Sequence, residues 1–173
     1  MAIQNSNPNG IRESERWYVR VIKQFQSNKK LIEKEGLGNI VKSPSMGVLT
    51  AFYYDPKYKE TLPLYDRFPL VVPFEPKAQG FLGLNMHYLP PSQRKMLFDS
   101  LMGIRTRKGL TPDNVIMVTY GMLKETARFP GWDVCIKHYL PDHIQSPFLN
   151  INPNQWEFVV PLPLQQFSKS RPY

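Results

Sequence analysis

The residues best suited to chemistry lie around two copies of one tetrapeptide. The sequence HYLP occurs at 87–90 and again at 138–141, and the two copies contain two of the three histidines in the chain. Cys135 lies three residues before His138, and Asp142 and His143 follow the second copy. Thiol, imidazole and carboxylate groups this close together could hold a metal ion or form a nucleophile–base pair.

Neither chemistry has a complete pattern in this sequence. The spacing around His138 fits no standard zinc motif, and the second ligand pair of a closed site is missing. Alternation along a strand would place Cys135 and His138 on opposite faces. The aspartates that could form a carboxylate pair are placed where aspartate commonly caps turns: Asp55, Asp66, Asp133 and Asp142. We therefore predict no catalytic residue, no metal site and no cofactor; an enzyme acting through Asp142 and His143 is the weakest hypothesis.

The positive charge of the chain is confined to two segments. The net charge is +8, and residues 1–47 carry eight Lys or Arg against four acids. Residues 92–128 carry seven against three, and the remaining residues carry seven against seven. Such basic segments indicate nucleic acid, another anionic surface or an acidic protein as the neighbour, with a solvated surface as the alternative. One cysteine excludes an intrachain disulfide framework, and no stretch reaches the ~18 apolar residues of a membrane span.

Periodicity and proline positions predict a mixed α+β chain. An amphipathic helix is expected from Ser14, and 36–47 reads as a linker. The 17 prolines are scattered and favour short elements with abrupt ends. Five strands are expected, at 46–56, 67–74, 79–89, 132–140 and 155–162.

Five short strands bury themselves best by curling, so we predict a small, partly open β-barrel with a Src-homology-3-like layout. Two helices are inserted at 91–129 between the third and fourth strands. The expected domains are a basic N-terminal helical arm and linker (1–45) and the barrel with its insertion (46–173).

The stretch FYYDPKYKETLPLYDRFPLVVPF (52–74) interleaves aromatic and basic residues. Aromatic rings among cations can stack on single-stranded nucleic acid. They can equally be core residues with lysine and arginine stems alongside, and strand alternation favours this interpretation.

The flanking sequences of the two HYLP copies differ, which argues against an internal repeat. We interpret each copy as the end of a strand that proline terminates. We expect the two strands to be neighbours in space, with His87 and His138 at corresponding ends.

The sequence resembles a family of known proteins over about residues 46–167. The matching strings are FYYDPKYKETLPLYDRFPLVVPF and GFLGLNMHYLPPSQRKMLFDSLM, followed by CIKHYLPDHIQSPFLNI and WEFVVPLPLQQF. They resemble a small virion protein of T-even-like tailed phages and cyanophages, most of all the DNA end protector, a head-completion family. The resemblance implies a non-enzymatic assembly protein that binds the genome terminus or lies at the head–tail junction of the virion.

Two hypotheses follow from the charge and the resemblance together. In the first, the protein binds the phosphates of a double-stranded DNA terminus without sequence preference, through Arg12, Arg16, Arg20, Lys23, Arg105, Arg107 and Lys108. In the second, it is a neck, tail or baseplate subunit that acts only through protein contacts. The partners would then be portal, neck, tail or baseplate proteins, the assembly a symmetric multimer formed in the host cytoplasm, and the partner-binding residues Trp17, Val21 and Phe25.

Overall fold

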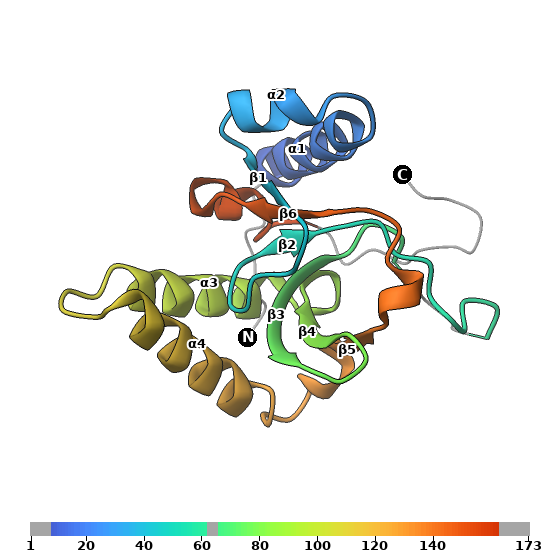
Figure 1. Cartoon of the computed structure of the whole chain (residues 1–173). Helices are drawn as coiled ribbons and strands as arrows, with labels where there is room; N and C mark the ends of the chain where they lie inside the picture. Colours follow the sequence, from blue (N-terminus) through green and yellow to red (C-terminus); the bar gives the residue numbers. More distant parts are fainter. Residues whose placement is uncertain (1–7, 62–65, 163–173) are drawn as a thin grey trace.

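The computed structural model describes residues 8–61 and 66–162 and contains one open, antiparallel sheet of six strands (Figure 1). The strand order is β1-β6-β2-β3-β4-β5. In chain order the strands are β1 (Gly38–Val41), β2 (Thr50–Ala51), β3 (Leu70–Pro76), β4 (Phe81–Asn85), β5 (Ile136–Tyr139) and β6 (Phe148–Ile151). The helices are α1 (Pro8–Ser27), α2 (Lys29–Lys34), α3 (Pro91–Arg105) and α4 (Pro112–Thr126). The 3₁₀-helices are η1 (Met86–Tyr88), η2 (Asp133–Cys135), η3 (Pro141–His143) and η4 (Pro153–Phe158).

The sheet buries side chains on both faces. Alternation in β3 sends Leu70 and Val72 into one hydrophobic core and Val71 into another. The larger core is shared with α1, α3 and η4, whereas the smaller one is rich in aromatic rings, including Phe52 and Tyr139. The aromatic run at 52–54 is therefore largely structural, as predicted. Tyr65, in the longer stretch 52–74, lies outside the described residues.

Local sequence signals mark the starts of α3 and α4. Thr111 caps α4, because its hydroxyl accepts a hydrogen bond from the Asn114 backbone N–H at 3.3 Å. Proline occupies the first turn of α3 and of α4, where its missing N–H costs nothing. The predicted two-helix insertion at 91–129 is confirmed. The N-terminal helix is confirmed too, but it begins at Pro8 rather than at Ser14.

The predicted Src-homology-3-like barrel is not confirmed. Six strands, not five, form the sheet, and its edge strands β1 and β5 do not pair with each other. The expected fifth strand at 155–162 is wrong: Pro153 follows an Asn152 cap and starts η4, while β6 supplies the strand just upstream. The segment predicted as a linker, 36–47, contains β1, which pairs with β6 along its whole length.

The expected domain boundary at residue 45 coincides with no break in the core. Trp17 and Phe25 of α1 pack in the same hydrophobic cluster as Leu84 of β4 and Leu149 of β6. The N-terminal helix is thus packed on the sheet rather than extended as an arm. None of the helices in the described ranges is long and apolar enough to cross a lipid bilayer.

The two HYLP strands are neighbours, as predicted, because β4 and β5 pair antiparallel. The antiparallel direction places His138 opposite Leu82, near the start of β4, whereas His87 lies in η1 beyond the other end of β4. The two histidines therefore do not lie at corresponding ends. In the first copy proline leads into α3, and in the second it begins η3.

A fully buried arginine joins α3 to the last described residues of the chain. Arg94 donates hydrogen bonds to the carbonyls of Met86 (2.7 Å), Val159 (3.0 Å) and Val160 (3.1 Å), and to that of Leu162. Burial lowers the pKa of Arg94 to about 10, which still leaves the guanidinium charged at neutral pH. Arg94 is one of the seven Lys or Arg residues in the basic segment 92–128, but it is fully buried and adds no charge to the protein surface.

Candidate nucleic-acid interface

The seven cations predicted to contact DNA are all exposed. On α1, spacing of three or four residues places four of them along one stripe of the helix, away from its buried side. Together with Glu15 they line a shallow groove of about 580 Å³: Arg12, Arg16, Arg20 and Lys23. The other three follow the end of α3 and enter the turn before α4: Arg105, Arg107 and Lys108. We call these seven residues the basic surface.

The two parts of the basic surface border the same element, η4. The Arg105 guanidinium lies over the Trp156 ring, 5.9 Å from its centroid. On the other side of η4, Phe158 stacks on Trp17 of α1 at 6.0 Å and lines a small hollow with Arg16 and Arg20. In Figure 1 the red segment that contains η4 lies between α1 and α3. Segments more than 80 positions apart in sequence therefore meet the same short helix.

The basic surface is not neutralised by carboxylates in the described part of the chain. The ion pairs found there involve other cations, such as Lys77 with Glu75 and Arg128 with Glu125. The acids of α1 nearest the stripe are Glu13 and Glu15, which leaves an excess of positive charge. Exposed, unneutralised cations are what the phosphate backbone of DNA attracts.

The three side chains predicted to bind a partner are buried within the chain itself. Trp17, Val21 and Phe25 are 3%, 1% and 2% exposed. The Trp17 indole N–H donates to Gln155 Oε1 at 3.0 Å, so even its polar atom is used internally. Packing of a helix against its own sheet and binding of a partner both need an apolar stripe. Here the stripe packs against the sheet.

The chemistry-bearing residues around the second HYLP copy do not converge on one site. His138 Nε2 donates to the Gln79 carbonyl at 2.5 Å, and His143 Nδ1 donates to the Asp55 carbonyl at 2.8 Å. Cys135 is buried in the main core, and this burial raises the pKa of its thiol to about 11. Within residues 8–61 and 66–162 no three His, Cys, Asp or Glu side chains gather as metal ligands would.

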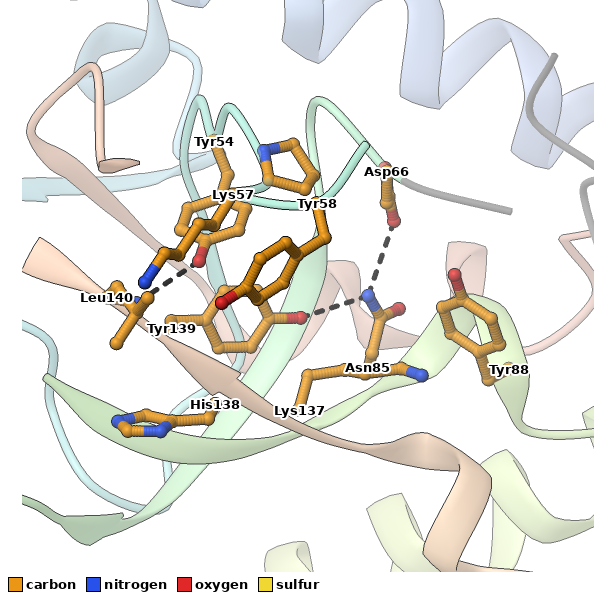
Figure 2. Close-up of a pocket in the computed structure, with 11 residues that line it drawn as sticks. Tyr54, Lys57, Tyr58, Asp66, Asn85, Tyr88, Lys137, His138, Tyr139 and Leu140 are labelled. Atoms are coloured by element: carbon orange, nitrogen blue, oxygen red, sulfur yellow. Dashed lines mark hydrogen bonds between the residues drawn. The ribbon is translucent and has the colours of Figure 1, made fainter. Parts of the chain in front are cut away.

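Both HYLP copies line a pocket of about 310 Å³ that sequence reasoning missed (Figure 2). We call it the tyrosine pocket, since its walls include four tyrosines and two lysines: Tyr54, Tyr58, Tyr88, Tyr139, Lys57 and Lys137. The first copy supplies Tyr88 and the second supplies His138, Tyr139 and Leu140. The pairing of β4 with β5 brings the two copies to one place, and the loop after Tyr54 forms the opposite wall.

A hydrogen-bonded network fixes the polar floor of this pocket. The Asn85 amide donates to the Tyr139 hydroxyl at 3.0 Å and to Asp66 Oδ2 at 3.4 Å, and its oxygen accepts from the His87 backbone N–H at 2.9 Å. The same Asp66 oxygen contacts His87 Nδ1, and its other oxygen accepts from the Phe68 N–H at 3.2 Å. Asn85 is 1% exposed, so the amide is held in one orientation.

Burial raises the pKa of Tyr54, Tyr88 and Tyr139, so these three pocket tyrosines are neutral phenols at neutral pH. Burial raises the pKa of Tyr139 well above its usual value, and the nearby Asp66 carboxylate raises it further. Burial likewise raises the pKa of Tyr88 to about 12. The positive charge at the pocket comes from Lys57 and Lys137; burial lowers the pKa of Lys137.

The sequence contained one signal for this pocket, the alternation of aromatic and basic residues at 52–59. The structure divides that stretch. Phe52 and Tyr54 are core residues, whereas Tyr58 is 63% exposed and stands at the pocket with Lys57 beside it.

One known family matches the chain. The sequence model of the family described as phage T4 terminal DNA protecting protein matches residues 2–173. No curated protein and no solved structure matches the chain.

Proposed function

Because the chain belongs to the phage T4 terminal DNA protecting protein family, we propose that it binds the end of linear duplex DNA in the virion and covers it. The observation that supports DNA contact is the basic surface, whose two parts border η4 from opposite sides. A duplex lying across η4 would meet α1 on one side and the α3–α4 turn on the other.

The basic surface would contact the phosphates of DNA rather than its bases. Arginine and lysine side chains on an exposed helix stripe neutralise phosphates and release counterions, which gives affinity without reading sequence. Protection of a terminus then needs no catalytic group, because a bound protein excludes a nuclease from the end that it covers. We accordingly assign no catalytic role to the histidines, Cys135 or the aspartates.

The second candidate function is a head-completion, neck, tail or baseplate role through protein contacts. Exposed apolar side chains on and after α3 and α4 favour it, since such side chains commonly mark protein interfaces. They are Met96, Met117, Phe129 and Val134. A symmetric multimer bound to portal or neck proteins would use these apolar side chains and leave the basic surface for DNA.

Salt dependence of DNA binding tests the phosphate proposal. If all seven cations contact phosphates, the logarithm of the binding constant should fall with the logarithm of salt with a slope of about −6. The R16Q/R20Q/R105Q/R107Q variant should reduce that slope by about 3–4, because each lost contact removes about 0.9. Fluorescence anisotropy with a labelled linear duplex measures both quantities.

The matched control removes exposed cations that already have a carboxylate partner. The K77Q/R128Q variant loses cations paired with Glu75 and Glu125, and it should keep the wild-type slope. An exonuclease assay on the same duplex should show that wild type shields the end and that the quadruple variant does not. Absence of binding by the wild type at low salt would reject the proposal, and an unchanged slope in the quadruple variant would reject the assigned surface.

A further inference from the structure

The tyrosine pocket has the size of a small-molecule site rather than of a macromolecular interface. Its volume of about 310 Å³ is at the low end of the ~300–1,000 Å³ found for ligand pockets. A pocket of this size can take one nucleotide but not a base pair. Whatever binds there from a nucleic acid must therefore be unpaired.

Two aromatic rings at the pocket each carry a lysine against one face. Lys137 Nζ lies 4.4 Å from the Tyr88 ring centroid, and Lys57 Nζ lies 5.2 Å from that of Tyr58. Figure 2 shows the Tyr58 and Tyr88 rings on either side of the Asn85 amide in this view. Rings that can stack on a base, next to cations that can neutralise its phosphate, are the two components of single-strand recognition.

The floor of the pocket is held in one shape by groups that are already hydrogen-bonded. The Asn85 amide, the Tyr139 hydroxyl and the Asp66 carboxylate bond to one another and are 5% exposed or less. Recognition of a ligand would therefore depend on the aromatic rings and the lysines of the pocket walls.

We propose that the tyrosine pocket binds an unpaired nucleotide at the DNA terminus, with its base against Tyr58 or Tyr88 and its phosphate near Lys57 and Lys137. This inference rests on the proposed DNA-end function and deepens it. Phosphate contacts alone cannot distinguish an end from the interior of a duplex, because phosphates are present in both. An unpaired terminal nucleotide is found only at an end, so the pocket supplies end selectivity and the basic surface supplies affinity.

The experiment compares DNA with and without ends. The full chain is titrated with a linear duplex bearing a short single-stranded overhang, and with a covalently closed relaxed circle of the same sequence. Wild type should bind the overhang duplex more tightly than the circle. Of the Y58A and Y88L variants, the one that removes the stacking ring should bind the overhang duplex roughly 5- to 150-fold more weakly, the effect of losing one stacked base. Both variants should bind the circle as wild type does.

The chain contains a matched control for these variants. Tyr120 on α4 also has a lysine over its ring, with Lys124 Nζ at 5.5 Å from the centroid, but it lies outside the pocket. The Y120A variant should keep wild-type affinity for both DNAs. Photocrosslinking from an iodinated pyrimidine in the overhang, followed by peptide mapping, should identify residues 54–58 or 85–88.

The outcomes separate the two proposals. If wild type prefers ends and folded Y58A and Y88L retain that preference, the nucleotide pocket is refuted and a segment of another protein becomes its occupant. If the variants lose affinity for the circle and the overhang duplex equally, the pocket is not an end-selective site. If wild type binds neither DNA at low salt, the DNA-binding function itself fails, whatever the pocket does.

Discussion

Replacement of Arg94 by methionine should destabilise the protein strongly, because Arg94 is the buried connection between α3 and residues 159–162. Methionine keeps an unbranched apolar side chain but removes the guanidinium. Four carbonyl oxygens would then lose a hydrogen bond, those of Met86, Val159, Val160 and Leu162. The Met86 and Val159 carbonyls keep a second donor, the backbone N–H of Leu89 and of Leu162 respectively. Three of these hydrogen bonds are buried and that to Val160 is partly buried.

The expected loss can be worked out from these contacts. The buried Leu162 carbonyl would be left without a donor, which costs about 1–3 kcal/mol. The hydrogen bonds lost by the Met86 and Val159 carbonyls cost about 1.5 kcal/mol each, and the Val160 carbonyl can recover a water. Removing the guanidinium also removes the cost of burying its charge, which offsets part of the loss. We expect the free energy of unfolding to fall by roughly 3–5 kcal/mol, and the melting temperature by about 6–20 °C for a chain of this size.

Urea denaturation followed by tryptophan fluorescence measures this change, with the dependence on denaturant checked for two-state behaviour. The control is K95M, one position along the same helix. Lys95 is exposed and pairs with Asp99 at 2.6 Å on the helix surface, so its loss should cost no more than ~0.5 kcal/mol. An R94M protein within about 1 kcal/mol of wild type, with an unchanged slope, would show that the carbonyl contacts contribute no net stability.

Further predictions concern backbone geometry and alkaline pH. Gly80 has φ +84°, and a Cβ there would lie 1.8 Å from the Tyr139 carbonyl oxygen, so G80A should cost at least ~2 kcal/mol in urea denaturation. G103A, in an open position of α3, should instead stabilise by ~0.5–1 kcal/mol, and equal effects of the two substitutions would contradict the geometry. Burial raises the pKa of Cys135 to about 11 and that of Tyr88 to about 12, so the unfolded chain releases these protons at lower pH than the folded one. Stability should be fully present below about pH 9 and decline as pH rises toward 11–12, which thermal melts across that range would show; a C135A variant should decline less steeply.

Helices and strands were predictable from the sequence where their boundaries depend on neighbouring residues. Helix starts depend on a few neighbouring residues, so Thr111 followed by Pro112 was sufficient to place α4, and the apolar stripe of α1 was sufficient to place that helix. β3 was predictable from its apolar run and from the prolines near the ends of that run. The resemblance to a family of phage DNA end protectors also came from the sequence, and the family match over residues 2–173 confirms it.

Other expectations failed because the deciding contacts are distant in sequence. The apolar residues at 155–162 alternate like a strand, yet Trp156 and Val159 reach the core from a 3₁₀-helix and a turn held by Arg94. Residues 36–47 carry little strand signal, but β1 forms because β6 offers it an edge.

The sequence by itself determined the helices, the charge of the two basic segments and the family. Only the tertiary structure decided that these segments border the same η4, that the supposed partner-binding stripe of α1 is core, and that the HYLP copies share a pocket. Helix periodicity and charge depend on residues a few positions apart, whereas these juxtapositions depend on strand pairing between residues more than fifty positions apart, such as Leu82 and His138.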